Sequence, residues 1–360
     1  MSSLNTDLLS IVIPVVNESA HIPGLLECLA QQRGADFEVV VADGGSTDGT
    51  PDKLLDLQPT LPFPLRVIET RRGRARQLNA AAAEARGEWL LFLHADSLFE
   101  GTDVLEAALE ALKEAIGRAG TDRLAGHFPL RFIRSEEEPC LAYYYYEAKA
   151  ALDRRGCTHG DQGFLLTRRF WQQIGPFDDT LPVLEDTFFA DEVRRHGRWI
   201  LLPGKILTSA RRFEVEGLRP RQTLNALIMN FAAIGWDDFF QEATSVYRSQ
   251  DAAGRLNLLP FLQLIRRLLR PLPAGRRLGL WYRTGRFVRP NAWQIAFFFD
   301  VRRAHRANAA AEQIDTPLLD RFEPLYEKTT DNIPGRFAAA VLVWIWFHLT
   351  FLACLLGEDR

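Results

Sequence analysis

Cysteines are few in this 360-residue sequence, and none of them lie close together. The four are Cys28, Cys140, Cys157 and Cys354, and no CxxC spacing occurs. This spacing argues against a zinc knuckle or a redox pair, and it is typical of reduced thiols in a cytosolic environment. The first residues also lack a basic segment ahead of an apolar run, so we expect no secretory signal peptide.

Two glycine-rich phosphate motifs are missing as well. No GxxxxGK(S/T) sequence occurs, which argues against a P-loop. The lysine-bearing glycine loop that nucleotidyltransferases place after their first strand is also absent. Internal repeats and low-complexity tracts are not found. The composition, with 47% hydrophobic and 25% charged residues, is typical of a folded protein rather than a disordered one.

Lysine and acidic residues are nearly absent from one basic stretch. Between Arg255 and Arg306 there are 12 arginines, no lysine and a single acid, Asp300. This stretch therefore carries +11, which leaves −14 for the rest of a chain whose net charge is −3. Because its arginines are interleaved with apolar residues, we predict a basic, amphipathic helical region over residues 249–336 that lies on an anionic membrane surface.

A long uncharged run occurs close to the end of the chain. Residues 337–356 contain no formally charged side chain. As a helix these 20 residues would span about 30 Å, the thickness of a bilayer core. The run predicts a membrane anchor, or a peripheral attachment, on the cytoplasmic face of a membrane. A buried helix of the globular part is the alternative, which His348 in the middle of the run favours.

Strand and helix patterns alternate over the first 210 residues or so. Apolar strands such as "IVIPVV", "FEVVVAD" and "EWLLFLHAD" are separated by helical segments. This alternation predicts an α/β fold, with a mostly parallel sheet covered by helices on both faces. We place this domain at residues 1–248. In such sheets ligands bind beyond the carboxyl ends of the strands, so the residues that follow each strand are the candidates for chemistry.

Polar residues follow three of these strands. Asp43 ends the second strand before a Gly-Gly-Ser turn, and its carboxylate either accepts hydrogen bonds from a nucleoside or only caps the turn. Arg72, Arg74 and Arg76 surround the start of a helix, where they favour a diphosphate or another anion over a plain solvated surface. Asp96 ends the segment "LLFLHADS".

The second half of the domain adds further polar candidates. Asp161 and Gln162 lie between two glycines and can contact a sugar or a diphosphate, or form an ordinary turn. Glu185 and Asp186 begin an amphipathic helix, where acids suit the helix dipole but can also act as a general base. A further pair of arginines follows what we expect to be the last strand, where the two side chains could close on a leaving diphosphate. This pair is Arg211 and Arg212.

These segments together resemble a known family. In chain order they read "IVIPVVNE", "VVVADGGSTDGT", "GRARQLNAAAAEARGEWLLFLHADS", "GDQGFLLTRRFWQQIGPFDD", "LEDTFFADEVRRHGR" and "TSARRFE". The sequence resembles the family-2 glycosyltransferases of GT-A fold, and it looks closest to the radical-SAM/selenodomain-associated transferase 2-like subgroup. The resemblance covers roughly residues 8–247, about two-thirds of the chain.

The resemblance implies an inverting, metal-dependent transfer from a nucleotide-diphospho-sugar to an acceptor hydroxyl. By position, Asp43 would recognise the base and Glu18 would lie near the nucleotide. Asp96 would bind Mn²⁺ or Mg²⁺, and Asp186 would be the catalytic base with Glu185 in support. The acceptor is unknown, and the basic region suits one that is lipid-linked or membrane-bound; no nucleic-acid partner is expected.

The chain departs from the family at "HAD", where many relatives have two acids. His94 and Asp96 are two residues apart at a strand end, so both can face one ion, and an imidazole would favour Mn²⁺ over Mg²⁺. Alternatively, Asp96 alone binds the metal and the donor diphosphate completes the coordination. The single acid also keeps a non-catalytic nucleotide-sugar-binding protein open as an alternative function. A nucleotidyltransferase is disfavoured by the missing lysine loop.

Overall fold

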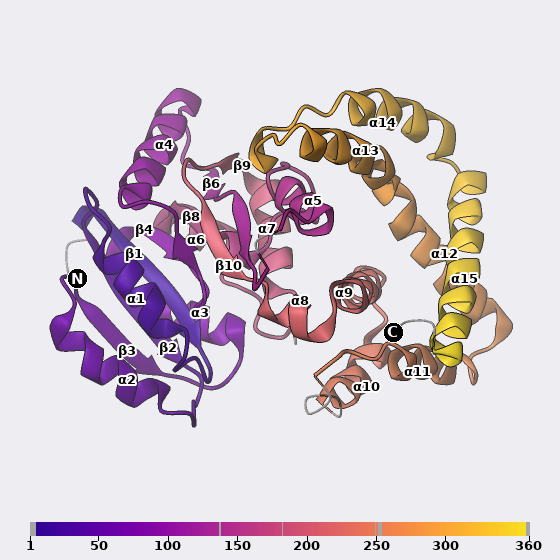
Figure 1. Ribbon diagram of the computed structural model, residues 1–360, viewed down its shortest axis with the longest axis horizontal. Helices are drawn as coiled ribbons and strands as arrows, with labels where there is room; N and C mark the ends of the chain where they lie inside the picture. Colours follow the sequence, from indigo (N-terminus) through magenta and orange to yellow (C-terminus); the bar gives the residue numbers. More distant parts are fainter. Residues whose placement is uncertain (1–4, 137, 182, 249, 251–253, 358–360) are drawn as a thin grey trace. The chain divides into compact units, whose positions relative to one another are not determined.

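The computed structural model of the chain contains two compact units. The structure describes residues 5–136, 138–181, 183–248, 250 and 254–357. The first unit comprises residues 1–133 and 137–209, and the second comprises residues 134–136 and 210–360. Figure 1 shows strands and helices mixed in the first unit and helices alone in the second.

The first unit alternates strands and helices, as the sequence predicts. Its strands are β1 Asn5–Val15, β2 Phe37–Asp43, β3 Leu65–Glu69, β4 Gly87–Phe92, β5 Leu98–Phe99, β6 Leu124–His127, β7 Leu130–Ile133, β8 Phe164–Thr167, β9 Arg198–Leu201 and β10 Ile206–Ser209. Its helices are α1 Ile22–Ala30, α2 Thr50–Leu57, α3 Arg74–Glu84, α4 Val104–Ala119, α5 Leu141–Ala150, α6 Arg168–Ile174 and α7 Glu185–His196, with short 3-10 turns η1 Gln58–Thr60 and η2 Gly160–Gln162.

The main sheet is mostly parallel. Its seven strands lie in the order β3-β2-β1-β4-β8-β6-β9, and a three-stranded sheet has the order β5-β10-β7. Within the main sheet, β8 alone runs antiparallel to its two neighbours, β4 and β6. All seven residues of β2 are buried, which shows that both faces of the sheet are covered. The fold class predicted from the sequence is confirmed.

Helix α3 packs closely on one face of this sheet, and three of its five buried residues are alanine. Ala75, Ala81 and Ala82 join a buried cluster with Val12 of β1 and Val40 of β2. Small side chains let the helix backbone approach the strands closely, so the start of α3 is held next to the carboxyl edge of the sheet. This is where the arginines of the sequence "RRGRAR" lie.

The antiparallel direction of β8 has a consequence for the same edge. Phe92, the last residue of β4, pairs with Phe164, the first residue of β8. The residues that follow β4 therefore lie beside the residues that precede β8. The segments "HAD", residues 94–96, and "HGDQG", residues 159–163, are far apart in the sequence but meet at one edge of the sheet.

The second unit is entirely helical in the part that the structure describes. Its elements are α8 Arg211–Glu216, α9 Leu218–Ala233, α10 Asp237–Arg248, α11 Leu259–Leu269, α12 Ala274–Val288, η3 Arg289–Ala292, α13 Trp293–Arg306, η4 Ala311–Gln313, α14 Pro317–Thr330 and α15 Ile333–Leu356. Helices α9 to α12 and α15 share one apolar cluster, which includes Phe231, Phe239, Phe261 and Phe347. The predicted division at residue 248 therefore falls inside this unit, because α9 and α10 pack with the helices that follow them.

Helix α15 is long, apolar and largely uncovered. Among the described residues it is the one helix long and apolar enough to cross a membrane, and only 17% of its most apolar window is buried. It packs closely against α12, where a Cβ atom added at Gly285 would lie 2.4 Å from the backbone nitrogen of Ala340. The two helix backbones therefore meet at a position that only glycine can occupy without a shift.

This close approach predicts opposite effects for two glycines of α12. Gly285→Ala is expected to destabilise the protein by about 1–3 kcal/mol, because the added methyl group overpacks against Ala340. Gly279→Ala is the matched control, since nothing lies within 4 Å of the added Cβ atom. The control should gain about 0.5–1 kcal/mol from helix propensity. Urea unfolding of the full-length protein measures both changes, and equal effects would contradict the packing argument.

Candidate active site

Asp186 is held at the carboxyl edge of the sheet by two backbone N–H groups. Its Oδ2 accepts a hydrogen bond of 2.7 Å from the N–H of Gly160, and its Oδ1 accepts one of 2.7 Å from the N–H of Thr187. Leu184, with φ of 68°, turns the chain directly before α7. A side chain at position 160 would collide, since a Cβ atom there would lie 2.9 Å from His94 Nε2 and 3.1 Å from Asp186 Oδ2.

Adjacent carboxyl groups at the start of α7 have pKa values displaced in opposite directions. Burial raises the pKa of Glu185, although Arg74 opposes it with Nη1 at 3.3 Å from Glu185 Oε1. Burial also acts to raise the pKa of Asp186, but the charges of His159 and Arg74, the Gly160 N–H and His94 together lower it. Asp186 is therefore kept ionised, which is the state that a proton acceptor needs.

Asp161 brings a third carboxyl group to this site. Burial raises its pKa to about 6, helped by the negative charges of Asp186 and Asp96 and opposed by His159. Its Oδ1 is buried and has no hydrogen-bond partner among the described residues. The structure thus places Asp96, Asp161 and Asp186 near enough for their charges to interact, and their roles in binding and catalysis stay predictions.

A metal ion would need ligands beyond the side chains of this site. Within the described residues there is no group of three or more His, Cys, Asp or Glu side chains that could hold an ion. The carboxylate of Asp96 and the imidazole of His94 are suitable donors for Mn²⁺. The buried, unpartnered oxygen of Asp161 adds negative charge nearby. The residues therefore fit a divalent cation whose remaining ligands come from a bound phosphate or from water.

Asp43 ends β2 and Glu18 follows β1, and hydrogen bonds join the loops after these two strands at the same edge of the sheet. The Asp43 carboxylate is buried and accepts hydrogen bonds of 3.0 Å from the N–H groups of both Gly45 and Ser46. Glu18 Oε2 lies 3.0 Å from His21 Nδ1, and the Glu18 N–H donates to Thr50 Oγ1. The turn-capping interpretation of Asp43 is therefore confirmed, and its contact with a base stays a prediction.

The predicted arginines are not all in one place. Arg74 pairs with Glu185, whereas Arg76 pairs with Asp179 at 3.2 Å. Arg72 is exposed in the loop before α3. Arg211 and Arg212 are exposed at the start of α8, which belongs to the second unit. Their contact with a donor stays a prediction.

Gln162 is engaged by the protein itself. Its side chain is fully buried, with Oε1 accepting from the His159 N–H and Nε2 donating to the Ala150 carbonyl and to His127 Nδ1. These bonds fix the η2 turn that carries Gly160 and Asp161. Ligand contact by Gln162 stays a prediction that these bonds do not favour.

Sequence reasoning missed His159 altogether. Its Nδ1 lies 3.2 Å from Thr187 Oγ1 and its Nε2 lies 3.2 Å from the Gly156 carbonyl oxygen. It connects η2 to the first turn of α7, and its charge does more than any other group to lower the pKa of Asp186. Its position directly before "GDQG" was the only signal in the sequence.

Comparison with known proteins agrees with this geometry. Residues 10–173 match the family model described as Glycosyl transferase family 2. This segment, a little under half of the chain, is similar to the family 2 glycosyl transferases. Its sheet and flanking helices have the GT-A architecture that the sequence predicts.

Curated relatives of the domain are also glycosyltransferases. An uncharacterized glycosyltransferase of Haemophilus influenzae is 29% identical over 157 residues, which cover 43% of this chain and 44% of the relative. A PGL/p-HBAD biosynthesis glycosyltransferase of Mycobacterium bovis is 40% identical over 103 residues, which cover 28% of this chain and 40% of the relative. The chain spans less than half the length of these relatives.

Solved structures give more distant likenesses. The mannosyltransferase PcManGT from Pyrobaculum calidifontis in complex with GDP-Man and Mn²⁺ is 20% identical, with a TM-score of 0.48 over 92% of this chain and 86% of its own. S. aureus TarS 1–349 in complex with UDP is 20% identical, with a TM-score of 0.44 over 83% of this chain and 91% of its own.

The buried His127 beside Gln162 predicts acid sensitivity of the first unit. Burial, aided by the charge of Arg194, lowers the pKa of His127 from 6.5 to about 4. The unfolded chain therefore binds a proton between these values that the folded chain does not, and stability falls as pH drops from 6.5 to 4. The expected loss is roughly 3 kcal/mol.

His127→Gln should remove this part of the pH dependence, because a Gln side chain can still accept the Gln162 amide but does not titrate. Urea midpoints measured across this pH range test it. His196→Gln, at an exposed position, is the control and should keep the wild-type slope. Identical slopes for all three proteins would contradict the assignment.

Proposed function

We propose that the protein transfers a sugar, with inversion, from a nucleotide-diphospho-sugar to an acceptor hydroxyl. The observation that carries this proposal is Asp186, which the charges of His159 and Arg74 and the Gly160 N–H keep ionised at the carboxyl edge of the sheet. It lies in a chain that is similar to family 2 glycosyl transferases over residues 10–173. The curated relatives support it at the level of glycosyl transfer. The transferase 2-like subgroup stays a prediction.

In this proposal Asp186 acts as the base. Its carboxylate takes the proton of the acceptor hydroxyl as that oxygen bonds to the anomeric carbon, and the bond from this carbon to the diphosphate breaks. The nucleoside diphosphate leaves from the opposite face. Gly160 and Thr187 fix the orientation of the carboxylate through their N–H groups. Arg74 holds the neighbouring Glu185, which supports the first turn of α7.

Asp96, with or without His94, would hold Mn²⁺ or Mg²⁺ in the transferase. The bound cation would neutralise the diphosphate charge that grows as the sugar leaves. Arg72 lies in the loop before α3 and Arg76 lies in its first turn. Both are therefore candidates for contact with the same diphosphate. Asp43 and Glu18 are proposed to face the nucleoside.

We also propose that the protein works at the cytoplasmic face of a membrane, on a lipid-linked or membrane-bound acceptor. Helix α15 leaves several large apolar side chains exposed, among them Phe337, Leu342 and Leu349 at 60%, 66% and 61%. The arginines of residues 255–306 lie in the same unit and suit anionic headgroups. Apolar contact and charge together support attachment.

Asp186→Asn is expected to lower turnover at least about a hundredfold, since the amide cannot accept the proton. Donor affinity should change less than about twofold, because the amide oxygen can still accept the Gly160 N–H. Release of nucleoside diphosphate, measured over a panel of nucleotide sugars with Mn²⁺, gives turnover, and thermal shift gives binding.

Asp191→Asn, which alters an acid of α7 that pairs with Arg155, is the matched control and should keep full turnover. Wild-type turnover in Asp186→Asn combined with loss in Asp161→Asn would move the base to Asp161. Donor binding without any release of nucleoside diphosphate by the wild type would favour the non-catalytic alternative.

Leu342→Glu combined with Leu349→Glu should release the protein from membranes. The transfer of two charged side chains on the exposed face of α15 into hydrocarbon has a high free-energy cost. Leu55→Glu, at a leucine of α2 that is 59% exposed, is the control and should stay bound. Sedimentation with vesicles that contain anionic lipid measures this. Release of the wild type by high salt alone would instead make the arginines the attachment.

A further inference from the structure

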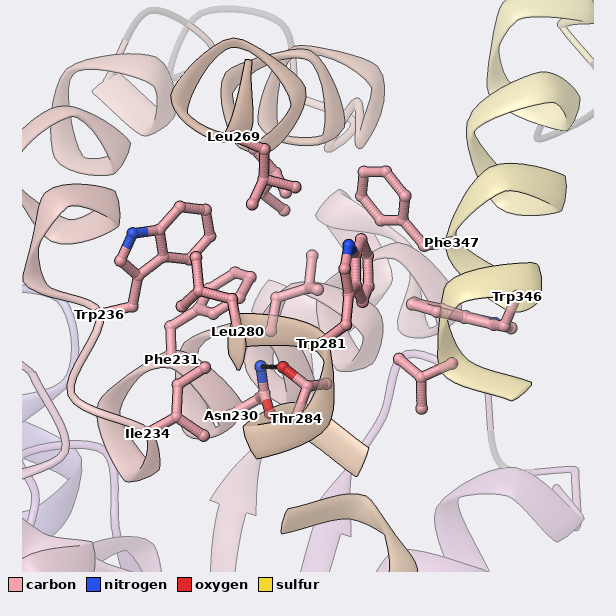
Figure 2. Close-up of a pocket in the computed structure, with 13 residues that line it drawn as sticks. Asn230, Phe231, Ile234, Trp236, Leu269, Leu280, Trp281, Thr284, Trp346 and Phe347 are labelled. Atoms are coloured by element: carbon pink, nitrogen blue, oxygen red, sulfur yellow. Dashed lines mark hydrogen bonds between the residues drawn. The ribbon is translucent and has the colours of Figure 1, made fainter. Parts of the chain in front are cut away.

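A pocket lies within the second unit, among α9, α11, α12 and α15. It contains about 380 Å³ of empty space, part of it open to solvent. Figure 2 shows the rings of Trp236, Trp281 and Phe347 around this space, with Trp346 of α15 at one side. The lining is almost wholly apolar, so it suits a hydrocarbon rather than a sugar or a nucleotide.

One polar group in the lining is incompletely satisfied. Asn230 is 5% exposed and its Nδ2 donates a hydrogen bond of 3.2 Å to Thr284 Oγ1 (Figure 2). Its Oδ1 is buried and has no hydrogen-bond partner among the described residues. A buried acceptor without a donor is rare in folded proteins. A water molecule beside the proposed occupant would supply this donor, since a hydrocarbon chain has none.

Positive charge lies next to the apolar lining. Arg283 Nη1 donates a hydrogen bond of 3.2 Å to the carbonyl oxygen of Ile234, which lines the pocket. The Arg266 guanidinium lies 4.2 Å from the centre of the Phe351 ring, and Arg266 directly follows the lining residue Ile265. Both arginines are exposed.

The pocket also reaches the apolar surface of α15. Trp346 contributes to the lining and is 43% exposed, so its ring is partly in the pocket wall and partly on the outer surface. On the same helix, Leu342, Leu349 and Leu352 are more than half exposed. A hydrocarbon chain from lipid that contacts α15 would therefore pass Trp346 to enter the pocket.

We propose that this pocket binds the hydrocarbon chain of a lipid whose headgroup carries a phosphate. The chain occupies the apolar space between α9, α12 and α15, and the phosphate pairs with Arg266 and Arg283. This assignment concerns a lipid site in the second unit. It is independent of the sugar chemistry in the first unit, because binding can be measured without any sugar donor.

The test uses octyl phosphate as the probe, below its micelle-forming concentration, with the full-length protein held in an amphipathic polymer. Isothermal titration calorimetry should show saturable binding. Octanol, with the same chain and no charge, should bind about tenfold more weakly, as should octyl phosphate to Arg266→Gln. Arg267→Gln is the matched control, since this neighbouring arginine pairs with Glu242 and should leave binding unchanged.

Two tryptophans of α15 provide a second comparison in which folding is not at risk, since both are nearly half exposed. Trp346→Ala should weaken octyl phosphate binding about tenfold, because a lining ring is lost. Trp344→Ala should leave the affinity unchanged, because Trp344 does not line the pocket. Leu269→Phe, which fills the pocket, and Leu268→Phe, which does not, form a further pair with the same expected contrast.

Equal binding by Trp346→Ala and Trp344→Ala, or heat that never saturates, would overturn the pocket assignment and leave only adsorption to the surface of α15. Equal affinity for octanol and octyl phosphate would overturn the phosphate contact. Loss of sugar transfer in Asp186→Asn with normal octyl phosphate binding would show that the two sites fail separately.

Discussion

The hydrogen bond from the Gly160 N–H to Asp186 Oδ2 is the constraint on which the proposed active site depends. It joins the turn before β8 to the first turn of α7, and through these to the end of β4. It requires a residue without a side chain at position 160, because both His94 and Asp186 lie within 3.1 Å of an added Cβ atom. It also favours the charged form of Asp186, which burial alone would disfavour.

Much of this arrangement could be predicted from the sequence, because apolar runs that end in polar residues indicate buried strands and the edge of a parallel sheet. The positions of Asp96 and Asp186 followed from this pattern together with the family resemblance. His159 and the buried role of Gln162 could not be predicted in the same way. Both depend on β8, which runs antiparallel between β4 and β6. The pairing of strands that are distant in the sequence cannot be predicted from the composition of each strand.

The boundary between the units was harder to predict than the elements themselves. Residues 218–248 form amphipathic helices whose apolar sides could belong to either neighbour in the chain. They pack with α11, α12 and α15 because large aromatic residues such as Phe231 and Phe239 need an apolar partner surface of similar size. The sequence resemblance continued to residue 247, but the family model ends at residue 173.

The contact between Gly285 and Ala340 also limits how the second unit can meet a bilayer. Since α12 and α15 touch backbone to backbone at this point, neither helix can slide along the other without opening the contact. This contact sets the distance between the arginines of α12 and the exposed leucines of α15. In the proposed membrane attachment, immersion of α15 and the approach of these guanidinium groups to headgroups would therefore be coupled.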